Sequence, residues 1–312
     1  MKTVFMGTGP FAAKTLETLY SSEHAPVMVV TQPDRPNSRR GGKIVFGEVK
    51  QFALERGIPL LQPEKVSTDE NAAILASTGA QCAVVCSFGQ LLKKNILFDT
   101  FEYGCINIHA SLLESYRGAA PINRAIMNGE TVCGVTIMYM DEGLDTGDMM
   151  IKDSTPVSDR DTFGTLSERL SLIGGDLAVK ALDLLQKGEA PRTPQDESRS
   201  SYAAKILKAD KHVDLTRSAR SVFNHIRGMD PSPAAECTFD SRTVKLFSCE
   251  IASEHSEGNE GPGTILKGDK RGIYIQCGDG VLLIKTLKPE GKGLMEASSF
   301  YNGIKNRELK FS

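Results

Sequence analysis

Short apolar runs alternate with amphipathic segments through residues 1–189 of the chain. The apolar runs lie at residues 3–6, 27–31, 82–86 and 104–108, and segments with helical spacing lie at 45–56, 68–78 and 121–128 and from Asp161 or Thr162 to Lys187. Such alternation predicts parallel strands joined by crossover helices. We therefore expect an α/β fold with a Rossmann-like, doubly wound parallel sheet, and a short helix around residues 89–95.

The pattern of apolar and polar residues changes after residue 189. Residues 190–201 are polar, contain prolines and show no periodicity, which is typical of a linker. Five short strand candidates follow, at residues 234–239, 244–250, 263–266, 273–277 and 281–287, separated by Gly- and Asp-rich turns. Their regular spacing indicates a small OB-like β-barrel. The expected organisation is a catalytic domain at 1–189, a linker at 190–207 and a C-terminal domain at 208–312.

Composition limits the class of protein. The net charge of the 312 residues is −2, so any nucleic-acid partner must be bound by local positive charge. The seven cysteines are an odd number and several lie within apolar runs, which favours reduced, buried thiols over disulfides or a metal site. The chain enters a strand directly, without a signal sequence or a long apolar span. We therefore expect a cytoplasmic protein with no membrane association and no metal, and a monomer by default.

Two polar residues interrupt the apolar run Cys105–His109 near its end. Asn107 and His109 are two apart, so in a strand their side chains face the same way. An amide beside an imidazole suits a carbonyl carbon under attack, because the amide can hold the oxyanion while the imidazole moves protons. Asp145 lies in a glycine-bounded loop, from which a carboxylate could orient the imidazole. Taken alone, these residues are also compatible with a buried Asn and a satisfied core His.

The motifs around these residues favour the catalytic interpretation. Asn107-x-His109-x-Ser111-Leu112-Leu113 is followed by the segments at 116–122, 134–138 and 143–148. In order and spacing this series resembles the folate-dependent formyltransferases, and the resemblance extends from Met1 to about Leu309. One position departs from the family pattern: Glu114 stands where a proline is usual. Proline would fix φ and remove an N–H at this turn.

The resemblance implies a function and a set of site residues. Within the family, the chain is most similar to members that transfer a formyl group from 10-formyltetrahydrofolate to the α-amino group of methionine on initiator tRNA. Asn107, His109 and Asp145 would then be catalytic. The folate would be bound by the loop Phe88, Gly89, Gln90 and Leu91 and by the turn Ser111, Leu112, Leu113 and Glu114.

Two groups of basic residues are candidates for tRNA binding. Arg35, Arg39, Arg40 and Lys43 lie in a Gly- and Pro-containing loop that cannot form a stable helix, and arginine makes bidentate contacts with phosphate. The resemblance implies that this loop approaches the acceptor end of the tRNA. Lys205 and Lys208 lie at the end of the linker, before a C-terminal region with an excess of Lys and Arg.

Other functions stay open on the residues alone. Gly7-x-Gly9-x-x-Ala12 follows a strand, but the pattern is short and no acidic residue ends the second strand, so a tight turn beside the cleft is favoured over dinucleotide binding. The same catalytic residues would serve a formyltransferase acting on an amino-sugar nucleotide or on glycinamide ribonucleotide. A non-catalytic tRNA- or folate-binding module and a hydrolase that releases formate are the remaining alternatives.

Overall fold

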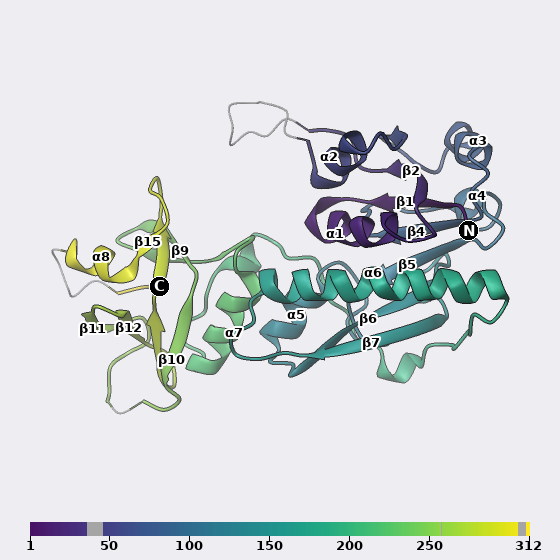
Figure 1. The fold of residues 1–312 in the computed structure, drawn as a ribbon. Helices are drawn as coiled ribbons and strands as arrows, with labels where there is room; N and C mark the ends of the chain where they lie inside the picture. The colour runs from purple at the N-terminus through teal and green to yellow at the C-terminus, as the bar shows by residue number, and fades with distance from the viewer. Residues whose placement is uncertain (36–45, 257, 305–309) are drawn as a thin grey trace. The chain divides into compact units, whose positions relative to one another are not determined.

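A seven-stranded sheet forms the centre of the N-terminal part of the computed structural model, which describes residues 1–35, 46–256, 258–304 and 310–312 (Figure 1). The strands are β1 (Thr3–Gly7), β2 (Pro26–Val30), β3 (Leu60–Leu61), β4 (Cys82–Cys86), β5 (Cys105–His109), β6 (Val132–Tyr139) and β7 (Met149–Pro156), in the order β3-β2-β1-β4-β5-β6-β7. The first five strands of this order pair in parallel, which confirms the predicted sheet. The sequence did not reveal that β6 pairs antiparallel with β5, which places Thr136 opposite His109.

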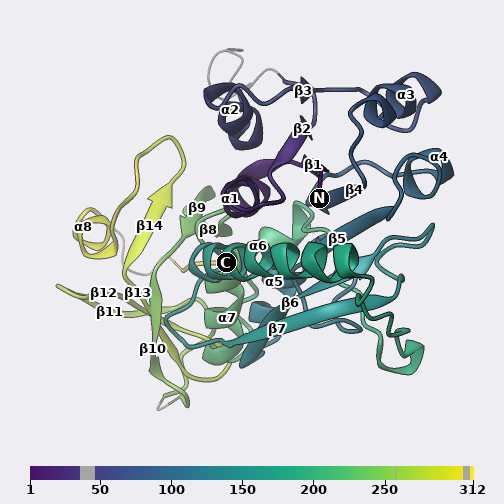
Figure 2. The ribbon, with the colours of Figure 1, turned by 45° about the vertical axis from the view of Figure 1, so that its right-hand side comes forward.

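Helices cover both faces of this sheet. On one face α1 (Gly9–Tyr20) and α6 (Phe163–Lys187) lie side by side, as the two views show (Figures 1 and 2). Gly175 lets α6 approach α1 closely, because an added Cβ would meet Thr18 at 2.6 Å, and Gly174 lets α6 approach β5, because an added Cβ would meet Ile108 at 2.8 Å. On the other face, apolar residues of the sheet pack with those of α3 (Asp69–Ser77) and α4 (Lys94–Leu97).

Two helix predictions need correction. The helix expected around residues 89–95 lies at Lys94–Leu97 instead, because Ser87 and Gly89 have φ of 49° and 77° and hold the preceding residues in a loop. The helix expected at 45–56 is α2 (Glu48–Glu55), preceded by Gly47 in an extended conformation. This helix packs against α1.

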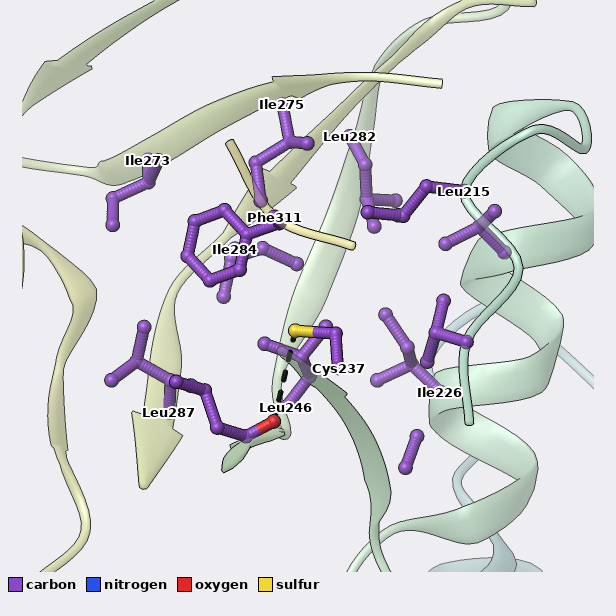
Figure 3. Packing of buried hydrophobic residues seen from close by; sticks show 14 of the residues in the cluster. Leu215, Ile226, Cys237, Leu246, Ile273, Ile275, Leu282, Ile284, Leu287 and Phe311 are labelled. Carbon is purple, nitrogen blue, oxygen red and sulfur yellow. Dashed lines mark hydrogen bonds between the residues drawn. The ribbon is translucent and has the colours of Figure 1, made fainter. Parts of the chain in front are cut away.

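The C-terminal strands form two antiparallel sheets around a shared core. The strands are β8 (Ala235–Phe239), β9 (Arg242–Leu246), β10 (Cys249–Ser253), β11 (Ile265–Asp269), β12 (Gly272–Gln276), β13 (Val281–Ile284), β14 (Thr286–Pro289) and β15 (Met295–Glu296). The sheet orders are β10-β13-β12-β11 and β15-β14-β9-β8. Figure 3 shows Leu246 of one sheet and Ile284 of the other in the same interior, facing Ile226. This arrangement confirms the OB-like prediction.

Two of the predicted C-terminal strands are each divided in the structure. Residues 244–250 fall into β9 and β10, and 281–287 into β13 and β14, because the chain passes from one sheet to the other at Phe247–Ser248 and at Lys285. The breaks face each other: Lys285 N donates to Ser248 O at 2.9 Å and Phe247 N donates to Thr286 O at 3.1 Å. Apolar periodicity continues through these bends, so the sequence pattern did not reveal them.

The chain forms two compact units that do not follow a single cut in the sequence. The first contains residues 1–118, 133–155 and 167–202, and the second contains residues 119–132, 156–166 and 203–312. The second unit therefore includes α5 (Pro121–Met127), which packs against α7 (Ala219–Met229). Asn123 Nδ2 donates to Gly228 O at 2.7 Å at this contact. The remaining helix, α8 (Ala297–Asn302), belongs to the same unit.

Candidate active site

The candidate site residues of the first unit gather at one edge of the seven-stranded sheet. The loops after β1, β4 and β5 all leave the carboxyl ends of parallel strands, which meet at the same edge. Thr8 Oγ1, after β1, donates to Phe88 O after β4 at 3.4 Å, and Gln32 Nε2, after β2, donates to the same carbonyl at 3.0 Å. In open α/β sheets this edge is where ligands bind.

The structure brings Asn107, His109 and Asp145 together. Asn107 Nδ2 donates to Asp145 Oδ1 at 3.3 Å, and His109 Nδ1 lies 3.6 Å from Asp145 Oδ2. The second distance is too long for a hydrogen bond but close enough for an ionic contact. The His109 and Asp145 side chains are 5% and 13% exposed, so their interaction is only weakly screened by water. The cluster that the sequence predicted is therefore present.

The ring of His109 is held from its other side as well. Its Nε2 lies 2.9 Å from the carbonyl oxygen of Tyr116, which can only accept a hydrogen bond. Both ring nitrogens thus face oxygens, an arrangement that orients the ring and suits a histidine that takes up and releases a proton. Gly118 N is a second hydrogen-bond donor to the carboxylate, since it donates to Asp145 Oδ2 at 2.8 Å.

The loop that carries Asp145 is tightly constrained. Asp145 has φ of 56°, in the left-handed region that residues with a Cβ rarely adopt. Gly147 lies so close to Tyr139 that an added Cβ would sit 1.9 Å from its carbonyl oxygen. Asp141 Oδ1 accepts hydrogen bonds from Gly143 N at 2.9 Å and Thr146 Oγ1 at 2.8 Å, which closes the loop. The carboxylate is therefore presented from a fixed backbone.

The turn at residues 111–114 follows directly after β5. Thr136 on the neighbouring strand ties it down: Leu113 N donates to Thr136 Oγ1 at 3.1 Å, and Thr136 Oγ1 donates to Ser111 O at 2.7 Å. Ser111 Oγ in turn donates to Ser115 O at 2.6 Å. Ser111, Leu113 and Glu114 are buried, and Leu112 is partly buried. The turn is thus rigid although it lacks the proline usual in the family.

The loop at residues 88–91 divides into structural and accessible parts. Phe88 is 2% exposed and belongs to the core, and Gln90 is used internally, since its Nε2 donates to Pro63 O at 2.9 Å. Leu91 is 74% exposed, and Gly89 is exposed with φ of 77°. An exposed apolar side chain beside accessible backbone suits contact with a flat heterocycle. Leu91 and Gly89 therefore fit a folate better than Phe88 and Gln90 do.

Glu114 is a buried carboxylate that stays ionised. Its Oε1 accepts a hydrogen bond from Asp196 N at 3.2 Å, and its Oε2 lies 3.6 Å from Arg199 Nε. The Asp196 N–H first, and the charges of Arg199 and Lys152 after it, lower the pKa of Glu114 below its usual value. The side chain contacts Asp196 and Arg199, so Glu114 connects the turn to the segment around residue 196.

We expect Glu114→Gln to lower stability in a pH-dependent way. Because the folded pKa lies below the ordinary 4.5, the contribution of the ionised form is complete above that value and is lost as pH falls through the folded pKa. Chemical unfolding near neutral pH should show a loss of about 1 kcal/mol, shrinking on acidification. Exposed Glu189 provides the control, Glu189→Gln. A Glu114→Gln deficit that does not shrink in acid would contradict this account.

The basic residues proposed for tRNA are only partly described. Arg39, Arg40 and Lys43 lie outside the described residues. The Arg35 side chain is 78% exposed and lies 3.9 Å from Glu64, so its guanidinium is accessible. Lys205 and Lys208 are exposed in the second unit, on the segment between residues 203 and 218. The structure therefore leaves these three side chains available for phosphate without assigning a contact.

The cysteine side chains of the protein are mostly buried thiols. The part of the chain that the structure describes contains no cluster of three metal-binding side chains, and its helices include none long and apolar enough to cross a bilayer. All seven cysteines are free and six are buried, in line with the expected reduced thiols. Burial raises the pKa of Cys82 and of Cys86 to about 12, which makes both thiols unreactive.

Comparison with known proteins gives this arrangement a family. Residues 1–182 match the formyl transferase family model, and residues 205–305 match the model of the formyl transferase C-terminal domain. The chain is 44% identical over 305 residues to the methionyl-tRNA formyltransferase of Citrifermentans bemidjiense, covering 98% of this chain and 94% of that protein. It is 41% identical to the methionyl-tRNA formyltransferase of Macrococcus caseolyticus, covering 98% and 96%. The chain belongs to the methionyl-tRNA formyltransferase family.

Solved structures show that the formyltransferase fold is shared more widely. HypX from Aquifex aeolicus in complex with tetrahydrofolic acid superposes with a TM-score of 0.64 at 17% identity, covering 97% of this chain but only 47% of that one. An N-formyltransferase from Helicobacter canadensis, in complex with folinic acid and dTDP-3-aminofucose, gives a TM-score of 0.69 at 18% identity, covering 91% and 98%. At these identities the likeness establishes the fold alone.

The site contains residues to which the sequence assigned no role. Arg117 stood within a family motif, but its partner Glu197 is distant in sequence; Arg117 Nη1 and Nη2 each lie 2.9 Å from that carboxylate. The hydrogen bond to Glu197 raises the pKa of Arg117. Thr136 and Gln195 also bond to the loops of this formyltransferase site. Gln195 lies in a polar segment without periodicity, so nothing local marks it.

Proposed function

We propose that this chain transfers a formyl group from 10-formyltetrahydrofolate to the α-amino group of methionine on initiator tRNA. The observation that carries the proposal is the cluster at the end of β5, in which one carboxylate contacts both an amide and an imidazole. The names of relatives about 40% identical over nearly the whole chain support the acceptor. The compact C-terminal unit and the basic residues 35–43 also favour tRNA, since a small acceptor requires neither.

The reaction forms a bond between the amine nitrogen and the formyl carbon and breaks the bond between that carbon and the folate nitrogen. Free α-amino groups have pKa values of about 7.7–8.0, so a useful neutral fraction exists near pH 7. Asn107 Nδ2 carries two N–H groups. One donates to Asp145, and the other is available for the oxyanion of the tetrahedral intermediate.

The other two residues handle the proton in this proposal. His109, held between Tyr116 O and Asp145, would stabilise the oxyanion or protonate the departing folate nitrogen. Asp145 would orient His109 and help to accept the proton of the amine, directly or through a water molecule. The fixed loop around Asp145 supports this role, because a positioned carboxylate needs no reorganisation during the reaction.

The folate would lie against the two loops that flank the catalytic strand. Leu91 and Gly89 offer an apolar side chain and exposed backbone, and Ser111 to Glu114 form a turn tied to Thr136. Phe88 and Gln90 would support the loop from inside. We propose Arg35, Arg39, Arg40 and Lys43 for the acceptor end of the tRNA and Lys205 and Lys208 for its phosphates. The protein would act in the cytoplasm, as a monomer.

The test is single-turnover formylation of initiator methionyl-tRNA with 10-formyltetrahydrofolate. We expect formylmethionyl-tRNA to form at the rate at which the folate donor is consumed, and His109→Ala to abolish both. Transfer to an amino-sugar nucleotide in place of the tRNA would show that the proposed acceptor is wrong and that the proposed formyl transfer is right. Formate released without any acceptor would make the chain a hydrolase, and folate binding without turnover would make it a binding module.

A further inference from the structure

The segment at residues 195–201, expected to be a linker, is bonded to the backbone beside the catalytic residues. Tyr116 N donates to Ser201 Oγ at 2.9 Å, and Arg117 N donates to Ser201 O at 2.9 Å. Ser201 N reaches Glu114 O at 3.4 Å. All of these residues belong to the first compact unit. The segment therefore lies along the loop whose Tyr116 carbonyl holds His109.

A single side chain at the start of this segment joins the two loops of the site. Gln195 Nε2 donates to Asp145 O at 2.9 Å and to Gly147 O at 2.7 Å. Its Oε1 accepts from Arg117 Nε at 2.9 Å, while the rest of that guanidinium is held by Glu197. The amide of Gln195 thus holds the backbone at Asp145 and connects it, through Arg117, to the loop that contacts His109.

The bonds to Gln195 act where the backbone needs support. Asp145 has a left-handed conformation, with φ of 56°, and its own carbonyl is one of the two acceptors. A residue with a Cβ leaves this conformation readily unless its surroundings fix it. Gly118 N and His109 both lie at contact distance from Asp145 Oδ2. A change of backbone conformation at Asp145 would therefore break these contacts of the carboxylate.

We propose that Gln195 is a positioning residue for Asp145, and that residues 195–201 hold the loops of the catalytic cluster in register. The inference rests on the proposed roles of Asp145 and His109. In this proposal, a polar segment between the two parts of the sequence supports the reaction without contacting the substrates. This role also accounts for the use of a primary amide, since the site requires one acceptor and two donors at this point.

Two variants separate the donors from the acceptor. Gln195→Glu retains the acceptor for Arg117 but places an oxygen against two carbonyls, whereas Gln195→Met fills the space with neither function. Gln51→Glu and Gln51→Met, at an exposed position on α2, are the matched controls. We expect kcat in formyl transfer to fall about tenfold to a hundredfold in both Gln195 variants. KM for either substrate should change less than about twofold, and the controls should match the wild type.

A merely structural role makes a different prediction in a double-mutant cycle. If Gln195 acts through Asp145, then Gln195→Glu should reduce kcat by less than about twofold once Asp145 is already Asn. If Gln195→Glu lowered kcat as much in the Asp145→Asn variant as in the wild type, the proposal would be overturned. So would wild-type kcat in both Gln195 variants, or a loss that vanishes when rates are compared at equal folded fractions from thermal unfolding.

The cycle also distinguishes this proposal from the proposed function. The rates are taken as ratios to the wild type with whichever acceptor the wild type formylates. If the wild type does not formylate initiator tRNA, the double-mutant cycle is therefore measured with a different acceptor. A coupled loss with another amine acceptor supports the positioning role, and an uncoupled loss with the tRNA refutes it.

Discussion

Replacement of Asn107 with alanine is expected to lower kcat by about a hundredfold to a thousandfold. The loss of one oxyanion donor typically costs roughly 2.7–4 kcal/mol of transition-state stabilisation. The effect should fall on kcat, with KM for the tRNA and for the folate nearly unchanged, because the donated bond strengthens only as charge develops on the oxygen. Single-turnover formylation of initiator methionyl-tRNA measures this directly.

The structure supplies a control for this prediction. Asn302 is exposed at the end of α8 in the C-terminal unit and is not a member of the cluster, so Asn302→Ala removes the same group and should retain wild-type kcat. The Asn107 side chain also bonds to Asp145, and thermal unfolding should be measured alongside the rates. Near-full activity of Asn107→Ala would remove Asn107 from the mechanism.

Asp145→Asn should be as damaging, for a geometric reason. Asp145 Oδ1 accepts from Asn107 Nδ2, and Oδ2 accepts from Gly118 N and faces His109 Nδ1. An asparagine keeps only one of these two oxygens, so an amide N–H must face a donor in either orientation. Loss of positioned proton transfer costs typically about a hundredfold to ten-thousandfold, and we expect kcat to fall within this range.

Asp148 provides the matched control in the same segment of the chain. Its side chain is 35% exposed and lies 3.4 Å from Arg192 Nη1, so Asp148→Asn removes a charge near the site without entering the cluster. This variant should remain active to within about twofold, since exposed ion pairs contribute about 0–1 kcal/mol. If Asp145→Asn and Asp148→Asn lowered kcat equally, the effect would be one of overall charge and not of the cluster.

The candidate cluster and the residues proposed for tRNA lie in different parts of the chain. The cluster of Asn107, His109 and Asp145 lies entirely within the first unit, at the carboxyl edge of the sheet. Of the described residues proposed for tRNA, Arg35 follows β2, and Lys205 and Lys208 lie in the second unit. In the proposed function, formyl transfer and contact with the tRNA would therefore depend on different parts of the chain.

Local sequence predicted most of the regular elements and the clustering of Asn107, His109 and Asp145. The period-two pattern at Cys105–His109 placed Asn107 and His109 on one strand, and the glycines around Asp145 indicated a loop that could reach them. These predictions succeeded because strand periodicity and turn chemistry act over a few residues. Predictions failed where apolar periodicity ran through a bend, as at Phe247–Ser248 and Lys285.

Other features were decided only by tertiary structure. The sequence determined the strands of the parallel sheet, the OB-like second part and the side chains of the candidate cluster, because each follows from patterns a few residues long. It could not show that residues 119–132 and 156–166 belong to the second unit. Nor could it show that Gln195 bonds to the carbonyls of Asp145 and Gly147. Those contacts join residues some fifty positions apart, and only the folded chain brings their donors and acceptors within hydrogen-bonding distance.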